Sequence, residues 1–520
     1  MDLTGLYLTL AVGTGVVLVS VAAARLATRL GMPVLLAYLG VGLLLGQDGL
    51  GLPFDDAALA QALGLAALAV ILVEGGLTTA VSDVRPVLAP ATVLATVGVL
   101  VSVAVTAAAT HLLLDVGWQT ALLLGAIVSS TDAAAVFSVL RSVPLPKRLT
   151  SLVEAESGLN DAPTFILVLT FSAATLEAVE PLPTLVAMIF QLVAGGVIGL
   201  LIGAAGAWLL RRITLPTSGL HPIAIVACGV LAYAVAGLTQ TSGFLAAYLA
   251  GLVLGNAGLP HRRATRSVAE GLGWIAQIGL FVMLGLLVTP SELPSSVVPA
   301  LVVGSALLLL ARPVSVLLSL APFRVPLREQ AFLSWAGLRG AVPIVLATIP
   351  VVTGAPGSDQ VFNIVFLLVV VFTVIQAPAL PWLARKLRIT HHDVGPDLQV
   401  ELAPLDAMDA DLIHVTVEPG SRLQGVYLPE LRLPPPAATT LVVRGPDTFV
   451  PDEHTRLRVG DQLVVLTTPR VREATERRLR AVARAGRLAH WFGESGHPDP
   501  ATRPEPAGRL QTAGPPTRRR

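Results

Sequence analysis

Long apolar stretches recur along the first three-quarters of the chain, and short polar segments separate them. A helix that crosses the hydrocarbon core of a membrane needs about 20 mostly apolar residues. By that criterion the chain is predicted to cross a membrane about thirteen times, and because three stretches are short, a count that differs by about one or two also fits. The predicted spans lie near residues 3–24, 33–47, 57–77, 87–114, 120–140, 154–174, 183–210, 221–236, 242–255, 269–288, 297–320, 329–350 and 360–384.

Composition supports a membrane protein and excludes several other classes. The 520 residues are 54% hydrophobic and only 13% charged, whereas about a quarter of the residues of a soluble domain are charged. The net charge of +1 gives no reason to expect nucleic acid as a partner. The single cysteine, Cys228, excludes an internal disulfide and a metal site built from several cysteines.

The loops between the predicted spans alternate in charge, which predicts the orientation of the chain. All loop bases fall in one set of loops, and the other set contains acids or is neutral. Because cytoplasmic loops are enriched in Lys and Arg, we expect the N-terminus outside and the C-terminus in the cytoplasm of a cell (inner) membrane. The first span lacks a basic leader and a small-residue cleavage site, so we interpret it as a retained helix. The loop bases are Arg25, Arg29, Arg85, Arg141, Lys147, Arg148, Arg211, Arg212, Arg262, Arg263, Arg266, Arg324, Arg328, Arg385, Lys386 and Arg388.

Several ionisable residues fall inside predicted spans, where charge is costly and usually marks an ion or proton path. Asp132 follows Ser129-Ser130-Thr131, and Glu156 and Asp161 lie within one short segment. Arg312 and Arg339 interrupt two later spans. Buried charges are normally paired, and three acids facing two bases leave one carboxylate without a counter-ion. A mobile cation or a proton could occupy that position.

Helical spacing predicts which side chains share a face. Ser157 and Asp161 are four residues apart, as are Glu156 and Asn160, so we expect all four to reach one cavity. A proton can then compete with a monovalent cation for the oxygens of Asp161. The alternative is a structural ion-pair network, an interpretation that suits Glu156 best. Glu74, near the predicted cytoplasmic end of the third span, fits a helix-end carboxylate at least as well as a working one.

Two spans contain residues that favour an interrupted helix. The fifth contains the polar run 129–132, and the twelfth contains Gly337, Gly340 and Pro343. The two spans are seven apart, an odd displacement, so equivalent segments would run in opposite directions, as in the inverted repeats of transporters. Gly195, Gly199 and Gly203, spaced by four, favour close helix packing, either within the protomer or across a dimer.

The motifs resemble those of the cation:proton antiporter-1 family, the NhaP and NHE type exchangers, over roughly residues 5–388. Ser130-Thr131-Asp132 resembles the motif of that family's unwound helix, and Glu156-Ser157-Gly158-Leu159-Asn160-Asp161 resembles its Glu-Ser-x-x-Asn-Asp ion site. The segments 243–251, 281–285 and 337–343 are also similar to family motifs.

This resemblance implies roles for individual residues. Asp161 would be the shared carrier and the position of the monovalent cation, and Asn160, Thr131, Asp132 and Ser157 would shape the ion/proton site. Glu156 would form a structural ion pair with an arginine. Arg312 is the first candidate for this partner, and Arg339 is the second. The Asn160-Asp161 step is similar to that of electroneutral members.

The resemblance also implies a fold and leaves the cation open. The family fold is an all-α dimer of 12 to 14 helix protomers with NhaA-like inverted repeats, discontinuous helices and elevator-like alternating access. Many sodium-selective relatives have proline where this chain has Ala133, and the segment 131–138 is closer to the potassium/proton subgroup. Pro163 is displaced by one residue from the usual Asn-Asp-Pro of that subgroup. Potassium and sodium therefore both remain candidates.

After Arg388 the pattern changes to short alternating strands separated by Pro and Gly turns, which predicts a small cytoplasmic α+β domain. Residues 400–470 resemble the RCK-C (TrkA-C) regulatory domain of potassium transporters; the strand-rich pattern also fits a purely structural appendage. By analogy the domain dimerises and binds a small cytosolic ligand, such as a cyclic dinucleotide. No RCK-N domain accompanies it, so NAD or another cofactor is not expected. Residues 471–491 are predicted as a basic amphipathic helix that could contact anionic lipid, and residues 492–520 as a disordered tail.

The chain is thus predicted to be a secondary active cation/proton antiporter rather than an enzyme, with residues 1–388 as the exchanger domain, a homodimer in the lipid bilayer and a role in pH homeostasis. Two other classes of protein fit the sequence less well. A gated cation channel or uptake protein with an RCK-C domain would need a filter loop of backbone carbonyls, and no such run appears. An intramembrane aspartyl protease using Asp132 and Asp161 would need Tyr-Asp and Gly-x-Gly-Asp motifs, which are missing.

Overall fold

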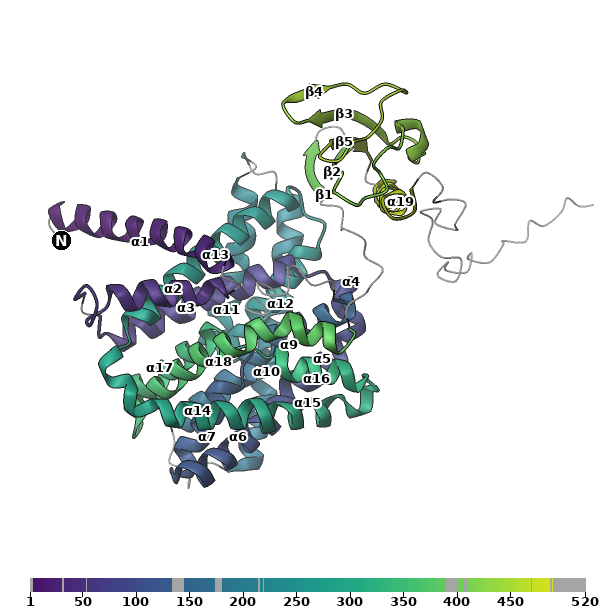
Figure 1. Ribbon diagram of the computed structural model, residues 1–520. Helices are drawn as coiled ribbons and strands as arrows, with labels where there is room; N and C mark the ends of the chain where they lie inside the picture. The colour runs from purple at the N-terminus through teal and green to yellow at the C-terminus, as the bar shows by residue number, and fades with distance from the viewer. Residues whose placement is uncertain are drawn as a thin grey trace, which may run out of the picture. The chain divides into compact units, whose positions relative to one another are not determined.

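The computed structural model contains two compact units, Met1–His391 and His392–Arg520 (Figure 1). The structure describes residues 3–29, 32–52, 54–132, 145–173, 180–213, 216, 217, 219–389, 400–405, 410–468, 470–486 and 489. The predicted tail at 492–520 and the part of the fifth predicted span from Ala133 onward lie outside these residues.

The first unit is helical throughout its described residues. Its α-helices are α1 (Leu3–Arg29), α2 (Val34–Leu45), α3 (Ala57–Thr78), α4 (Val81–Val84), α5 (Leu88–Val93), α6 (Val99–Leu114), α7 (Trp118–Ser129), α9 (Lys147–Ala173), α10 (Pro181–Arg212), α11 (Leu220–Leu238), α12 (Gly243–Asn256), α13 (Arg262–Leu286), α14 (Val297–Ala306), α15 (Arg312–Leu320), α16 (Leu327–Ala336), α17 (Ala341–Thr353) and α18 (Ser358–Lys386). Short 3₁₀ or π turns continue α4 into α6 and α14 into α15.

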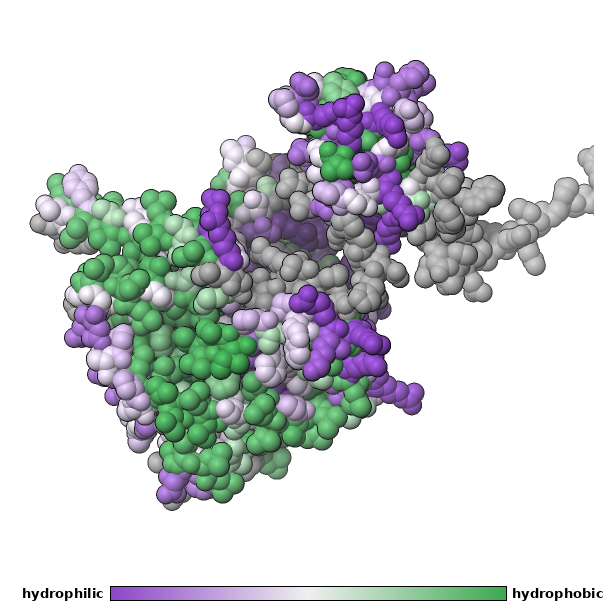
Figure 2. All heavy atoms as spheres, viewed as in Figure 1, coloured by the Kyte–Doolittle hydropathy of each residue, from purple (hydrophilic) through white to green (hydrophobic). Residues whose placement is uncertain are grey.

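These helices confirm the predicted polytopic membrane fold. Among the described residues, eight helices or continuous helical runs are long and apolar enough to cross a membrane, or nine if the bent pair α16–α17 counts as one span. Helices α2, α7 and α12 are apolar but shorter, and α9 is long but contains several charges. Each predicted span therefore overlaps a helix or a helical run within the described residues, and the fifth does so through α7, up to Ser129. Figure 2 shows a broad hydrophobic surface on this unit.

The helices of the first unit pack into two bundles. We use "first bundle" for α1, α2, α3 and α10–α13, and "second bundle" for α4–α7, α9 and α14–α18, because the helices of each set pack mainly against one another. The two bundles meet where α3 packs against α17 and where α12 packs against α9. The junction between them is the place where a cavity can form.

The glycine stripe of α10 lies inside the first bundle. A Cβ atom on Gly195 would overlap the backbone of Ser242, and one on Gly199 would overlap the backbone of Ala246 in α12. Glycine therefore permits the close approach of α10 to α12. Of the two interpretations of this stripe, the structure shows packing within the protomer.

Two helices of the second bundle are interrupted at the predicted places. Helix α7 ends at Ser129, and Ser130 is extended with φ −67° and ψ 146°. Helices α16 and α17 are separated by four residues and bent by 52°. The amide of Asp132 donates a 2.9 Å hydrogen bond to the carbonyl of Leu338, so the two interruptions contact each other through their backbones.

The second unit is a small α+β domain. Its strands are β1 (Val400–Leu405), β2 (Ala410–Thr416), β3 (Ala438–Arg444), β4 (Asp447–Phe449) and β5 (Gln462–Thr467). They form an antiparallel sheet in the order β1-β2-β5-β3-β4, and the helix α19 (Arg472–Ala485) follows it.

Helix α19 overlaps the amphipathic helix predicted at 471–491, and its apolar face packs on the sheet of this domain. Its apolar residues Leu479 and Val482 belong to the same buried core as Val415 and Val465 of the sheet. The guanidinium of Arg478 donates a 2.9 Å hydrogen bond to the carbonyl of Leu431. The apolar face of α19 therefore completes the core of this domain.

Candidate functional site

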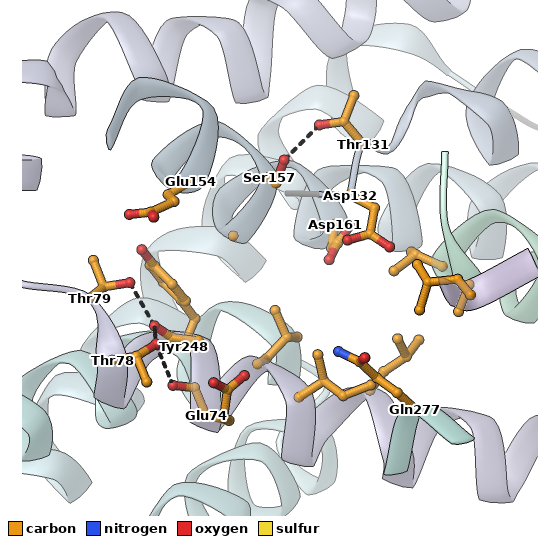
Figure 3. Close-up of a pocket in the computed structure, with 18 of the residues that line it drawn as sticks. Glu74, Thr78, Thr79, Thr131, Asp132, Glu154, Ser157, Asp161, Tyr248 and Gln277 are labelled. Atoms are coloured by element: carbon orange, nitrogen blue, oxygen red, sulfur yellow. Dashed lines mark hydrogen bonds between the residues drawn. The ribbon is translucent and has the colours of Figure 1, made fainter. Parts of the chain in front are cut away.

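A cavity of about 300 Å³ lies between the two bundles (Figure 3). The first bundle contributes its wall through α2, α3, α12 and α13, and the second through the segment before residue 133, α9 and the start of α17. The polar residues on its wall are Glu74, Thr78, Thr79, Thr131, Asp132, Glu154, Ser157, Asp161, Tyr248 and Gln277.

Helix α9 supplies two of the four carboxylates on the cavity wall from one face. Glu154, Ser157, Gly158 and Asp161 all line the cavity, and their spacing of three, four and seven residues places them along one stripe of a helix. Asp161 is 5% exposed. Its Oδ1 atom has no hydrogen-bond partner among the described residues. A buried carboxylate oxygen without a donor, facing a cavity, is suited to receive a proton or a cation.

The extended segment after α7 is fastened to α9 through Thr131. Asn160 Nδ2 donates a 2.6 Å hydrogen bond to Thr131 Oγ1, and Ser157 Oγ lies 3.0 Å from the same hydroxyl oxygen. Asn160 therefore faces Thr131 and is not part of the cavity wall. Its role in the structure is to position the segment that leads into Asp132.

Asp132 lies beside Asp161 at the same end of the cavity, as Figure 3 shows. Its carboxylate packs against the chain between α16 and α17, because a Cβ atom on Gly340 would overlap that carboxylate. The two carboxylates thus come from the two elements that the sequence singled out, the polar run before Ala133 and the Glu156–Asp161 motif.

Glu156 and Arg312 form a buried pair away from the cavity. Arg312 Nη1 donates to Glu156 Oε1 at 2.6 Å and Nη2 donates to Oε2 at 2.9 Å. The two side chains are 3% and 7% exposed. The expectation that Glu156 and Asn160 share a cavity with Ser157 and Asp161 is therefore wrong: helical spacing identified the faces, but Glu156 turns toward Arg312 and Asn160 toward Thr131.

Arg339 is a second buried arginine near this pair. It is 4% exposed, and its Nε and Nη1 atoms have no hydrogen-bond partner among the described residues. No ion pair joins it to a carboxylate in the described part of the chain. A Cβ on Gly337 would lie 2.9 Å from Arg312 Nε and 3.4 Å from Arg339 Nη1, so glycine makes room for the two guanidinium groups.

Six polar residues of the cavity wall were not among the predicted site residues: Glu74, Thr78, Thr79, Glu154, Tyr248 and Gln277. Glu74 was noted only as a helix-end carboxylate, although the last turns of α3 border the cavity. Tyr248 and Gln277 belong to the first bundle, and nothing in their own segments indicates that these segments face α9. Glu154 could have been found, because it lies seven residues before Asp161 on the same helical face.

Comparisons with known proteins agree with this architecture. The family described as "Sodium/hydrogen exchanger, transmembrane" matches residues 16–386. The chain belongs to the sodium/hydrogen exchanger family. It is therefore a multi-pass membrane protein and a transporter rather than an enzyme. Residues 412–480 match the TrkA-C domain, which includes most of α19.

The family relatives include proteins that are similar over most of their length. The K(+)/H(+) antiporter NhaP of Alkalimonas amylolytica is 37% identical over 86% of this chain and 79% of its own. The K(+)/H(+) antiporter NhaP2 of Shewanella baltica is 35% identical over 95% of this chain and 87% of its own. The solved structure of the sodium proton antiporter MjNhaP1 from Methanocaldococcus jannaschii has a TM-score of 0.64, 22% identity, and covers 74% of this chain and 99% of its own. That likeness shows the shared fold.

Proposed function

We propose that the protein is a secondary active monovalent cation/proton antiporter in which Asp161 binds the cation and the proton alternately. The observation that supports this most strongly is the buried carboxylate of Asp161 on the wall of a polar cavity, one oxygen of which has no hydrogen-bond partner in the described part of the chain. Membership of the sodium/hydrogen exchanger family supports the same reaction.

The neighbours of Asp161 suit a hard monovalent cation, which prefers oxygen ligands. Ser157 supplies a hydroxyl oxygen and Asp132 a second carboxylate within the same wall. Thr131 lines the cavity too, but its hydroxyl is engaged by Asn160 and Ser157, so we assign it to positioning. Because the Asn160-Asp161 step provides one carboxylate where two acids would provide two, we propose one cation exchanged for one proton, an electroneutral cycle.

The division into two bundles supports a mechanism of alternating access. Asp161 and Asp132 belong to the second bundle, whereas Glu74 and Tyr248 belong to the first. A displacement of the second bundle relative to the first would close this cavity and expose Asp161 on the other side. The Glu156–Arg312 pair would move with the second bundle as a neutral unit, without carrying net charge across the membrane.

The proposal also covers the orientation of the chain, the roles of its two units and its oligomeric state. Following the alternation of loop charge, we place the N-terminus outside and the C-terminal unit in the cytoplasm of the cell membrane. We assign exchange to residues 1–388 and regulation, through a small cytosolic ligand, to the TrkA-C unit. We also propose a homodimer, since α1 exposes a long apolar surface that includes Leu8, Leu18 and Leu26.

Potassium is the first cation to test. The relatives at 37% and 35% identity carry the name K(+)/H(+) antiporter, and the residues around Asp132 resemble the potassium/proton subgroup. Sodium remains the second candidate, because a relative from Synechocystis with 30% identity is named Na(+)/H(+) antiporter NhaS2.

Everted membrane vesicles holding a respiration-made proton gradient test this function. A pH-sensitive dye reports the gradient while potassium, sodium and lithium are added in turn, with wild type and Asp161→Asn side by side. Collapse of the gradient on cation addition in wild type only is the expected result. No response to any cation between about pH 6 and 9, the range in which a shared carboxylate must exchange its proton, would refute the proposal. So would equal responses from the two proteins.

A further inference from the structure

The cavity continues past Asp161 to a second carboxylate on the same helix face, Glu154. The two residues are seven positions apart, so Glu154 lies about 10 Å along the axis of α9 from Asp161, toward the start of the helix. The side chain of Glu154 takes part in no ion pair or hydrogen bond among the described residues. It is half-buried and borders the same space as the carrier.

Tyr248 of α12 faces Glu154 from the first bundle. The residue is 4% exposed, and its hydroxyl makes no hydrogen bond of normal geometry among the described residues, with the Thr79 hydroxyl and the Glu154 carboxylate close by. Its ring packs on Gly158, where a Cβ atom would lie 2.7 Å from ring carbon Cε2. Figure 3 shows the hydroxyl directed toward the carboxylate of Glu154. A buried hydroxyl without a partner is costly, unless a ligand of the cavity satisfies it.

Further oxygens lie on the same side of the cavity. Thr79 Oγ1 donates to the carbonyl of Gly75 at 2.6 Å, which leaves its lone pairs available to a cation. Glu74 also lines the cavity. This end of the cavity therefore combines two carboxylates with neutral hydroxyl oxygens, the ligand types that hard cations prefer.

We propose that Glu154 and Tyr248 form a second cation-binding station, which receives a monovalent cation from the cytoplasm and passes it to Asp161. The inference rests on the proposed antiport function. Because Glu154 belongs to the second bundle and Tyr248 to the first, the station is complete only in the present arrangement of the bundles. The station binds cations that arrive at this face. Its two residues move apart when the second bundle moves. A carboxylate at this position raises the local cation concentration.

The test measures apparent KM and Vmax for potassium at the cytoplasmic face, using the full-length protein in everted vesicles. Glu154→Gln removes the charge at constant shape, and Tyr248→Phe removes the hydroxyl but keeps the ring on Gly158. We expect Glu154→Gln to raise KM by about fivefold, with Vmax within about twofold of wild type, as expected for the loss of local attraction. Tyr248→Phe raises KM by a smaller factor, and Glu154→Asp restores part of the affinity.

Two matched controls accompany these variants. Glu180→Gln neutralises an exposed carboxylate that does not line the cavity, and Tyr233→Phe removes a tyrosine hydroxyl of α11 that does not line it either. Both controls should keep the wild-type KM and Vmax.

The outcomes separate the station from the antiport function. Failure of wild type to move protons on cation addition would overturn the proposed function and the station with it. Exchange by wild type with an unchanged KM in Glu154→Gln would overturn the station alone. If Glu154→Gln instead lowers Vmax and shifts the pH profile while KM is unchanged, Glu154 is a proton relay. That result would also overturn the station. If Glu154→Gln does not accumulate, an unchanged KM in Tyr248→Phe overturns the station.

Discussion

The amide of Asp132 donates a 2.9 Å hydrogen bond to the carbonyl of Leu338, joining the two places where helices of the second bundle are interrupted. An interrupted helix leaves backbone groups without partners, and such groups are tolerated at membrane depth only inside protein or beside a cavity. Here one backbone amide at the first interruption and one carbonyl at the second satisfy each other's hydrogen-bonding needs. The pairing holds Asp132 at the cavity, close to Asp161.

Gly340 is predicted to be intolerant of any side chain. A Cβ atom there would overlap the carboxylate of Asp132, so Gly340→Ala should displace that carboxylate and lower exchange on the order of 100-fold, as for a misplacement of about 1 Å. The comparison is Gly279→Ala in α13, where a Cβ meets no atom within 4 Å. Exchange rates in vesicles test this prediction. Equal rates in the two variants would show that the close contact between Gly340 and the Asp132 carboxylate is not needed for exchange.

The Glu156–Arg312 pair should behave as one unit in stability measurements. Removing one partner leaves a buried charge uncompensated, at a cost of about 3–5 kcal/mol. We therefore expect Glu156→Gln and Arg312→Gln each to lower the melting temperature of the purified protein in detergent more than the double variant does. Additive losses would show that the bidentate contact does not couple the two residues.

Sequence patterns predicted the helices and the charged residues of this protein better than they predicted which charges meet. Apolar length identified each span, and the cost of charge in a membrane identified Asp132, Glu156 and Asp161. Helical spacing assigned these residues to faces. It could not assign their neighbours, since Arg312 lies 156 positions after Glu156 in the chain.

The same limit explains the missed residues. Tyr248 faces Glu154 only because α12 packs against α9, a contact that no local pattern encodes. Similarly, the amphipathic pattern of α19 was real, but an apolar face identifies no partner by itself. The sheet of the same domain covers it.

Thr131 should be needed for its hydroxyl rather than its shape. Thr131→Val removes the acceptor of Asn160 Nδ2 and leaves a buried amide unpaired, at about 1–3 kcal/mol. We expect a lower exchange rate and a lower melting temperature for Thr131→Val, with both largely kept by Thr131→Ser. Wild-type behaviour of Thr131→Val would mean that the contact from Asn160 does not position the segment before Asp132.

The TrkA-C unit contains an ion pair that should make its stability depend on pH. Burial disfavours the charged form of Asp461, but hydrogen bonds from the Arg444 side chain and the Arg458 amide, each 2.8 Å long, outweigh it and hold its pKa below the ordinary value. This stabilisation is therefore present above about pH 4 and is lost as the pH falls through the depressed value.

Asp461→Asn tests that dependence. At pH 7 it should speed hydrogen–deuterium exchange of β5 amides in the full-length protein, after correction for intrinsic rates, and the difference from wild type should shrink below about pH 4. Asp447→Asn, at an exposed position in β4, should have no effect. A difference that persists unchanged at low pH would show that Asp461 does not act through its charge.

We have proposed that one carboxylate, that of Asp161, binds either a proton or a cation. The most direct measurement is proton release from purified, detergent-solubilised protein when potassium or sodium is added in weak buffer, followed with a pH-sensitive dye. We expect wild type to release up to about one proton per protomer, because that is the capacity of a single shared carboxyl group. Asp161→Asn should release none. Cation binding by wild type without proton release, or equal release from the variant, would contradict it.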